Sequence, residues 1–243
     1  EANRIKNELM EADRMSIIGQ MAAGVAHEIN NPLGIIRTNI ELIVAQGWSS
    51  EKAKDFVDSS LRNSVRAGKI IKDLLAVAKP KNPEMDHVNV LELIQSTLAV
   101  IGAQIKYVKV NLESKGETPY IWGDRNQIQQ VLVNIFLNAT DAMKGLKEPK
   151  MNITCCVAPN SSTVRIRIDD SGPGIHKSKL YSVFEPFVTH GKPDGFGLGL
   201  FISRMIVEAH NGIIFAESDE GKGAQITIEL PLSENGNGVH KKC

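Results

Sequence analysis

Residues 15–46 have the sequence MSIIGQMAAGVAHEINNPLGIIRTNIELIVAQ, and they decide the fold of the first third of the chain. Small or apolar residues recur in this stretch at alternating steps of four and three, which is the spacing of a coiled-coil seam. The pattern therefore predicts one long helix with a single packing stripe. That stripe consists of Met15, Gly19, Ala22, Ala26, Ile29, Leu33, Ile36, Ile40 and Ile43.

A second seam follows a break at residues 47–50 and has the same spacing. It consists of Val57, Leu61, Ser64, Gly68, Ile71, Leu75 and Ala78. Two long helices with a short connection form an antiparallel hairpin. One hairpin cannot close a core, and small residues on both seams allow close approach by a partner. We therefore expect a homodimer whose two hairpins form a four-helix bundle.

Pro80 and Pro83 end the second helical pattern, and the sequence changes character beyond them. Alternating patterns predict strands, and apolar periodicity predicts helices that lie between them in the sequence. This mixture is typical of an α+β two-layer sandwich with helices on one face of the sheet. The predicted strands are 108–112, 151–157, 163–169, 212–216 and 225–230, and the predicted helices are 91–101, 126–143 and 200–209.

The chain is thus expected to have several domains. Residues 1–14 are predicted to be a helix that enters from an upstream sensor, and residues 15–80 form the hairpin. A linker of residues 81–83 leads to the sandwich of residues 84–232. The tail, residues 233–243, lacks periodicity and is expected to be disordered.

Composition excludes two classes of partner. Lys plus Arg and Asp plus Glu both number 28 among the 243 residues. A balanced chain lacks the positive surplus that a nucleic-acid or polybasic membrane surface requires. No apolar run approaches the length of roughly 20 residues that spans a bilayer. We expect a cytoplasmic fragment without nucleic-acid or direct membrane contact, and anchoring of a longer parent protein in the inner membrane is left open.

His27 has an unusual position in the first helix. If Ala26 and Ile29 lie on the seam, then His27, Glu28 and Asn31 face away from the core. A lone His-Glu pair is usually a solvated surface. A zinc site of the His-Glu-x-x-His type is excluded, because the fifth position is Asn31. Pro32, which costs a helix interior ~3 kcal/mol, favours a functional interpretation of this turn.

Residues 24–33, GVAHEINNPL, closely resemble the phospho-acceptor box of sensor histidine kinases, within them most of all the nitrogen-regulation class. The resemblance implies that His27 accepts a phosphoryl group and that Glu28 hydrogen-bonds the imidazole and acts as its general base. Asn31 matches the position that orients water when the cognate response regulator is dephosphorylated. The chemistry fits, because a neutral imidazole is a nucleophile near pH 7 and an exposed one can meet a second protein.

Two segments of the second domain each have a structural and a functional interpretation. Asn134 and Asn138 lie four residues apart on an otherwise apolar helix. They are equally consistent with a hydrogen-bonded core pair and with ligands for a hard cation. Residues 169–174, DDSGPG, follow a predicted strand. They suit a tight turn, or a site where Asp170 accepts from an adenine amino group beside glycines that leave room for the ring.

Two further segments suggest a phosphate site and its cover. Residues 195–200, GFGLGL, run straight into a helix, whose amides and N-terminus attract anions. Their spacing is not G-x-G-x-x-G and they follow no strand, which excludes a dinucleotide fingerprint. Residues 184–194, FEPFVTHGKPD, are typical of a mobile lid anchored by its Phe residues.

Together and in this order, these segments resemble the N, G1, F and G2 boxes of the GHKL ATPase superfamily, and residues 221–224, GKGA, resemble the last glycine box. The resemblance implies ATP and Mg²⁺ as cofactors, with Asn138 on Mg²⁺ and Asn134 beside it. It implies that Asp170 holds adenine and that Gln130 lies near the reacting phosphate. The other implied nucleotide contacts are Asp141, Gly172, Gly174, Ile175, Phe187, Lys192, Gly195, Gly197, Leu198, Gly199 and Leu200. Asp141 departs from the basic residue of many relatives.

The sequence therefore predicts an ATP-dependent histidine kinase that phosphorylates His27 and then an aspartate of a response-regulator receiver domain. Two alternatives remain open. One is a module that binds nucleotide and a partner without transfer, and the other is a core that acts mainly as a phosphatase through Asn31. His87, His176 and His210 are expected to be structural or solvated.

Overall fold

The computed structural model describes residues 2–48, 52–78, 83–115, 119–158, 162–188 and 197–233. These residues belong to two compact units, which divide at Lys81 and Asn82. The short segment 197–198 groups with the first unit. Each unit is described by itself.

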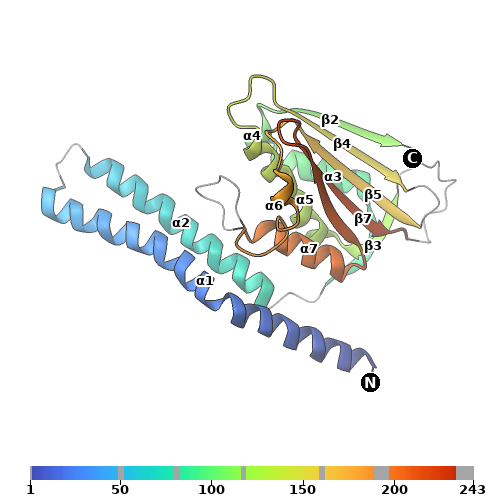
Figure 1. Ribbon diagram of the computed structural model, residues 1–243, viewed down its shortest axis with the longest axis horizontal. Coiled ribbons are helices and arrows are strands. Elements are labelled where there is room, and N and C mark those ends of the chain that lie inside the picture. Colours follow the sequence, from blue (N-terminus) through green and yellow to red (C-terminus); the bar gives the residue numbers. More distant parts are fainter. Residues whose placement is uncertain are drawn as a thin grey trace. The chain divides into compact units, whose positions relative to one another are not determined.

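The first unit is a helical hairpin (Figure 1) of α1 (Ala2–Gln46) and α2 (Ala53–Ala78). Helix α1 continues through Pro32, which is buried. Ser49 and Ser50, which belong to the predicted break between the helices, lie outside the described residues.

The predicted seam of α1 is buried only in part: Ile43 is buried and Ile29 and Ile36 are half-buried, but the other described seam positions are each displaced by one residue from the buried stripe. Val25, Pro32 and Asn39 are buried, whereas their neighbours Ala26, Leu33 and Ile40 are exposed. A single hairpin buries only the stripe that faces its own second helix. The seam positions Ala26, Leu33 and Ile40 thus remain on the outside of the isolated hairpin, together with a row of apolar side chains on α2. The large exposed apolar side chains of the hairpin are Leu33, Ile35, Ile40, Val44, Val57, Leu61, Val65, Ile71 and Leu75.

The second unit contains a five-stranded sheet with the strand order β2-β4-β5-β7-β6. Strands β2 and β4 are parallel, and the remaining neighbours are antiparallel. All five strands match predicted strands to within three residues at each end. The strands are β2 (Lys109–Lys115), β4 (Lys150–Val157), β5 (Thr163–Asp170), β6 (Ile213–Ser218) and β7 (Ala224–Pro231).

Helices cover one face of this sheet (Figure 1), and the core lies between the two layers. On β5, Val164, Ile166 and Ile168 are buried, whereas Arg165 and Arg167 alternate with them on the opposite face. The helices are α3 (Val90–Val100), α4 (Gly102–Ile105), α5 (Arg125–Ala142), α6 (Lys177–Leu180) and α7 (Gly199–Ala209). The two layers confirm the predicted sandwich.

Two short strands were not predicted. Strands β1 (Met85–Asn89) and β3 (Tyr120–Asp124) form a separate antiparallel pair, which leads directly into α3 and α5. Ser233 was assigned to the disordered tail, but its amide donates to the Tyr120 carbonyl and its hydroxyl contacts Nδ1 of His87. The second unit therefore extends through Ser233, and the rest of the predicted tail lies outside the described residues.

Candidate functional site

The surface around His27 has the predicted exposure at His27 and Asn31 but not fully at Glu28. His27 and Asn31 are exposed one turn apart on α1, Glu28 is half-buried, and Pro32 faces inward. Residues four apart on a helix share one face, so His27 and Asn31 present a continuous polar surface. A ligand or protein that approaches the hairpin can therefore reach both side chains together.

Asp170 is the last residue of β5, the central strand of the sheet, and is half-buried. Its Oδ1 accepts from the amide of Gly172 at 2.8 Å and from that of Ala224 at 3.3 Å. Burial raises the pKa of Asp170, the two amide bonds oppose the rise, and the neighbouring Asp169 adds to it. Among the described residues, no hydrogen bond to Oδ2 is present, so this oxygen can accept from a ligand.

Three glycines surround Asp170 because side chains do not fit there. A Cβ on Gly172 would lie 2.7 Å from Oδ1 of Asp170 and 3.3 Å from the Cβ of Ala142. Gly174 and Gly223 have φ values of +76° and +86°, which favour glycine. A Cβ on Gly223 would collide with the carbonyl oxygen of Asp170. The two loops therefore pack closely against each other and against Asp170.

Ser218 connects these two glycine loops. Its hydroxyl accepts from the amide of Ile175 at 2.8 Å and donates to the carbonyl of Gly223 at 2.6 Å. Ser218 was not among the predicted site residues, because it lies at the end of β6 outside every recognised motif. Its effect is to hold the half-buried Ile175 next to the loop that contacts Asp170.

Helix α5 carries the predicted carboxamides. Asn134 and Asn138 are half-buried, and Gln130 is exposed one turn before Asn134. The Nδ2 of Asn134 donates to the hydroxyl of Ser203 at 2.9 Å, which joins α5 to α7. Asp141 forms an ion pair with Lys144 at 2.7 Å.

The glycine-rich segment leads into α7 as predicted. Gly197 has a φ of +66°, Leu198 is buried, and Gly199 is the first residue of the helix. A Cβ on Gly199 would collide with the side chain of Asn134, so this glycine permits close contact between α7 and α5. Leu200 is half-buried.

The predicted lid is described only in part. Phe187 is half-buried and has the unusual φ of +63° for a residue with a side chain. Lys192 and Gly195 lie outside the described residues.

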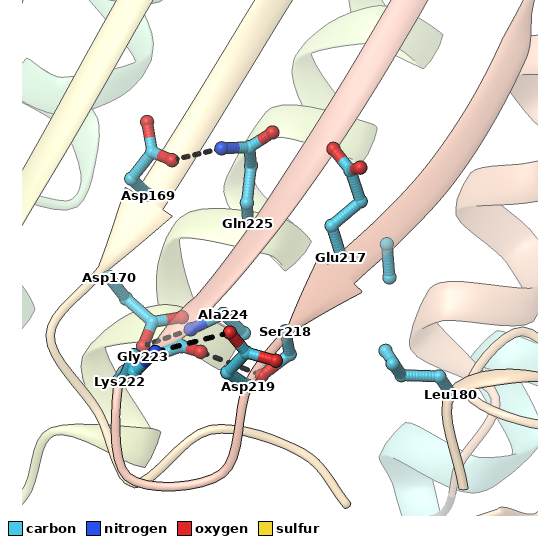
Figure 2. A pocket seen from close by; sticks show the side chains of 11 residues that line it. Asp169, Asp170, Leu180, Glu217, Ser218, Asp219, Lys222, Gly223, Ala224 and Gln225 are labelled. Carbon is cyan, nitrogen blue, oxygen red and sulfur yellow. Dashed lines mark hydrogen bonds and ion pairs between the residues drawn. The ribbon is translucent and has the colours of Figure 1, made fainter. Parts of the chain in front are cut away.

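A pocket of about 590 Å³ adjoins the glycine loops at the ends of the strands (Figure 2). Asp170, Gly223 and Ala224 line it together with groups of the open sheet face, where Gln225 donates to Asp169 at 2.5 Å. Its lining includes neither Asn134 nor Asn138. The pocket therefore overlaps the predicted adenine site only at Asp170 and the last glycine loop.

Two family models match the chain. The His Kinase A (phospho-acceptor) domain matches residues 17–83, and the histidine kinase-, DNA gyrase B- and HSP90-like ATPase matches residues 123–234. The first range contains His27, and the second contains Asp170, the glycine loops and both carboxamides. The chain belongs to the sensor histidine kinases.

Curated sensor histidine kinases are similar along nearly the whole chain. Sensor histidine kinase TmoS of Ectopseudomonas mendocina is 31% identical over 95% of this chain and 24% of that protein. Sporulation kinase E of Bacillus subtilis (strain 168) is 33% identical over 97% of this chain and 31% of that protein. This sensor histidine kinase chain thus spans less than half the length of these relatives.

Solved structures of sensor histidine kinases share the fold. Histidine kinase ThkA in complex with response regulator protein TrrA has a TM-score of 0.81 and 29% identity, over 96% of this chain and 67% of that one. The catalytic domain of ThkA alone is 32% identical, with a TM-score of 0.55 over 61% of this chain and 95% of that one.

Among the described residues, no helix is long and apolar enough to cross a membrane. The described part of the chain also contains no cluster of three His, Cys, Asp or Glu side chains suited to a metal ion.

Proposed function

We propose that this chain is a kinase core that transfers the γ-phosphoryl group of ATP to His27 and then to an aspartate of a response-regulator receiver domain. The observation that carries the proposal is the exposure of His27 within the segment that matches the phospho-acceptor domain. An acceptor must reach first a nucleotide and then a second protein, and only an exposed imidazole meets both requirements.

The transfer uses groups that the first helix presents. One ring nitrogen of neutral His27 forms a bond to the γ-phosphorus, while the bond between that phosphorus and the bridging oxygen breaks and ADP leaves with the electron pair. Glu28, the next residue, accepts the proton from the other ring nitrogen. The product is a phosphohistidine on the surface of α1.

The residues around Asp170 fit an adenine ring. Asp170 has a carboxylate oxygen that can accept from the exocyclic amino group, and its Oδ1 is fixed by two backbone amides. Glycine at positions 172, 174 and 223 lets the two loops pack closely beside Asp170, because a Cβ at any of these positions would collide with neighbouring protein atoms. The half-buried Ile175 supplies an apolar contact for the ring.

The carboxamides of α5 fit a nucleotide-bound cation, since amide oxygens are ligands that Mg²⁺ accepts. We assign the cation to Asn138, with Asn134 beside it and Gln130 one turn earlier. When bound, Mg²⁺ neutralises charge on the phosphates during transfer. Gly197, Gly199 and Lys192 are the remaining phosphate contacts of the proposal.

Two partners follow from the hairpin. The apolar row on its outside, which includes Leu33, Ile40 and Leu61, supports a second copy of this chain as one partner. The surface around His27 and Asn31 supports a receiver domain as the other, and ThkA, which is similar over 96% of this chain, was solved with a response regulator. The hairpin of residues 15–80 would then dimerise, and the domain of residues 84–232 would bind ATP.

An autophosphorylation assay with γ-labelled ATP tests the proposal. His27→Gln should lose all acid-labile label yet bind nucleotide as the wild type does, whereas Asn138→Ala should lose both. Label that persists in His27→Gln would refute the assignment. Nucleotide binding by the wild type without any label would instead favour the module that binds without transfer.

A mixture of the two variants tests the dimer and the direction of transfer. A mixed dimer holds one intact nucleotide site, on the chain that lacks His27, and one intact His27 on the other chain. Label should reappear in the mixture if transfer occurs between subunits, and should stay absent if it occurs within one.

A second activity, phosphatase action on the regulator, is favoured by the exposure of Asn31 one turn after His27. Its carboxamide can orient a water molecule beside the receiver aspartate. Asn31→Ala should retain autophosphorylation and slow the loss of phosphate from a prephosphorylated regulator. An unchanged rate of loss would exclude this role for Asn31.

A further inference from the structure

His210, which the sequence analysis expected to be structural or solvated, is 4% exposed at the end of α7 and forms two hydrogen bonds. The backbone amide of Asp124 donates to its Nε2 at 3.0 Å, and its Nδ1 lies 2.8 Å from the carbonyl oxygen of Ile206. A backbone amide can only donate and a carbonyl can only accept. The ring is therefore neutral, with its proton on Nδ1.

The residue that His210 contacts determines where α5 begins. Asp124 is the N-cap of α5, and its Oδ1 accepts from the amides of Asn126 at 2.8 Å and Gln127 at 3.1 Å. Its Oδ2 accepts from the amide of Glu84 at 2.8 Å. The carboxylate of the buried Asp124 thus accepts hydrogen bonds from its own helix and from the segment before β1. Its backbone amide donates to His210.

Gly123 shows how closely the ring packs against this turn. A Cβ on Gly123 would lie 2.9 Å from Cδ2 and 3.4 Å from Nε2 of His210. Cβ atoms essentially never approach a neighbour to less than 3.0 Å. Position 123 therefore accommodates only glycine while the His210 imidazole packs against it.

Helices α5 and α7 are thus joined at two places. One is the bond between Asp124 and His210, and the other is the bond between Asn134 and Ser203. Asn134 and Asn138 lie ten and fourteen residues after Asp124, or about 15 and 21 Å along the helix. Two contacts at separate points restrict both sliding and pivoting of one helix against another, whereas a single contact leaves the helix freer to pivot.

We propose that His210 is a positioning residue for nucleotide binding. Its neutral imidazole fixes the start of α5 against the end of α7, and so places Asn134 and Asn138 relative to Gly199. The inference rests on the proposed nucleotide site but adds a residue that touches no ligand.

Two substitutions of His210 test the hydrogen bond that its Nε2 accepts from the Asp124 amide. His210→Gln can keep an acceptor for the Asp124 amide, whereas His210→Leu removes it and leaves a buried amide without a partner. We expect ADP to bind about tenfold more weakly to His210→Leu, because only a fraction of molecules would hold the competent arrangement. His210→Gln should stay within about threefold of the wild type.

Val207→Ala is the matched control. Val207 is fully buried near the end of the same helix, but its side chain cannot form a hydrogen bond. Its truncation destabilises the domain without breaking the bond between Asp124 and His210. Each variant is measured well below its own melting temperature, so that loss of fold does not enter the affinity.

Two readouts do not depend on nucleotide. A ¹H–¹⁵N spectrum of the imidazole in the wild type should show a protonated Nδ1 and an unprotonated Nε2 at neutral pH. Hydrogen exchange at the Asp124 amide should be faster in His210→Leu than in Val207→Ala.

The possible results distinguish a failure of the proposed nucleotide site from a failure of the proposed role of His210. If the wild type fails to bind ADP, the proposed nucleotide site is wrong and the role of His210 falls with it. If the wild type binds but His210→Leu and Val207→Ala weaken binding equally, only the role of His210 is refuted. A protonated Nε2 in the wild type would also refute it.

Discussion

Asn134 on α5 donates to the hydroxyl of Ser203 on α7 at 2.9 Å, and Ser203 in turn donates to the carbonyl of Gly199 at 3.0 Å. This chain of two bonds connects a proposed nucleotide ligand with the first turn of the helix that follows the glycine-rich segment. The orientation of the Asn134 carboxamide therefore depends on a residue that was not part of any recognised motif.

Ser203→Ala should weaken both stability and nucleotide binding. The substitution leaves the Nδ2 of Asn134 without its partner, which we expect to lower the free energy of unfolding by about 1 kcal/mol. A carboxamide that is no longer held should also bind nucleotide less tightly. Urea denaturation and ADP titration measure the two effects.

Ser96→Ala is the control for this prediction. The Ser96 hydroxyl donates to the Leu93 carbonyl and accepts from Arg125, so it makes comparable bonds away from the carboxamides. ADP affinity should be unchanged in this variant. Equal loss of affinity in both variants would show that Asn134 is not oriented by Ser203.

Two glycines of one turn allow the energetic cost of a steric collision to be measured apart from that of backbone strain. Gly221 and Gly223 have similar φ values of +81° and +86°. A Cβ on Gly221 meets nothing within 4 Å, whereas one on Gly223 collides with the carbonyl of Asp170. Gly221→Ala should therefore cost only the strain of a left-handed residue, about 1 kcal/mol.

Gly223→Ala should cost at least twice as much and should abolish detectable ADP binding, because the loop must move away from Asp170. Urea denaturation and ADP titration of the two variants side by side provide the comparison. Similar values for both variants would mean that the loop relaxes freely and does not shape the site.

The helices and the main sheet were predictable because their signals are local. Period and spacing predicted α1, α2, α5 and the five strands of the large sheet, and the position of His27 on the outside of its helix followed from the seam. Strands β1 and β3 were missed because their sequences, MDHVN and YIWGD, do not alternate apolar with polar residues.

The contacts that orient the site were not predictable for a related reason. Asp124 and His210 are 86 residues apart, and Asn134 and Ser203 are 69 apart. A histidine after a helix and a serine within one are common, and nothing in their neighbours indicates a partner. Only the packing of α7 on α5 brings these pairs together.

The outer apolar row of the hairpin predicts how the dimer can be broken. Leu61 is 65% exposed in the single chain, although it belongs to the predicted seam of α2. Leu61→Glu places a charge where the second copy should pack, which is costly when buried without a partner. We expect a shift from dimer to monomer, measured by sedimentation equilibrium at micromolar concentration.

Arg62→Glu provides the control, since it introduces the same side chain at the next position, which is also exposed. This variant should remain dimeric. Helix content should be similar in both variants by circular dichroism. A dimeric Leu61→Glu would show that the second copy packs elsewhere on the hairpin.

The charged carboxylate of Asp170 should strengthen nucleotide binding while it lowers the free energy of unfolding. Burial raises its pKa, so the folded state disfavours the charged form relative to the unfolded chain. The free energy of unfolding contributed by this group therefore falls as the pH rises from the unfolded pKa through the raised folded one, and is constant above it. Asp170→Asn can keep Oδ1 as the acceptor for both backbone amides but carries no charge.

The carboxamide introduced by Asp170→Asn has a donor in place of the second carboxylate oxygen, and a donor cannot accept from an adenine amino group. We therefore expect Asp170→Asn to be at least as stable as the wild type at pH 7, with the difference shrinking toward acidic pH, while ADP binding falls more than tenfold. Asp169→Asn is the control, because Asp169 bonds to Gln225 on the open face of the sheet. A stability difference between wild type and Asp170→Asn that does not change with pH would contradict the raised pKa, and unaltered ADP affinity would remove Asp170 from the site.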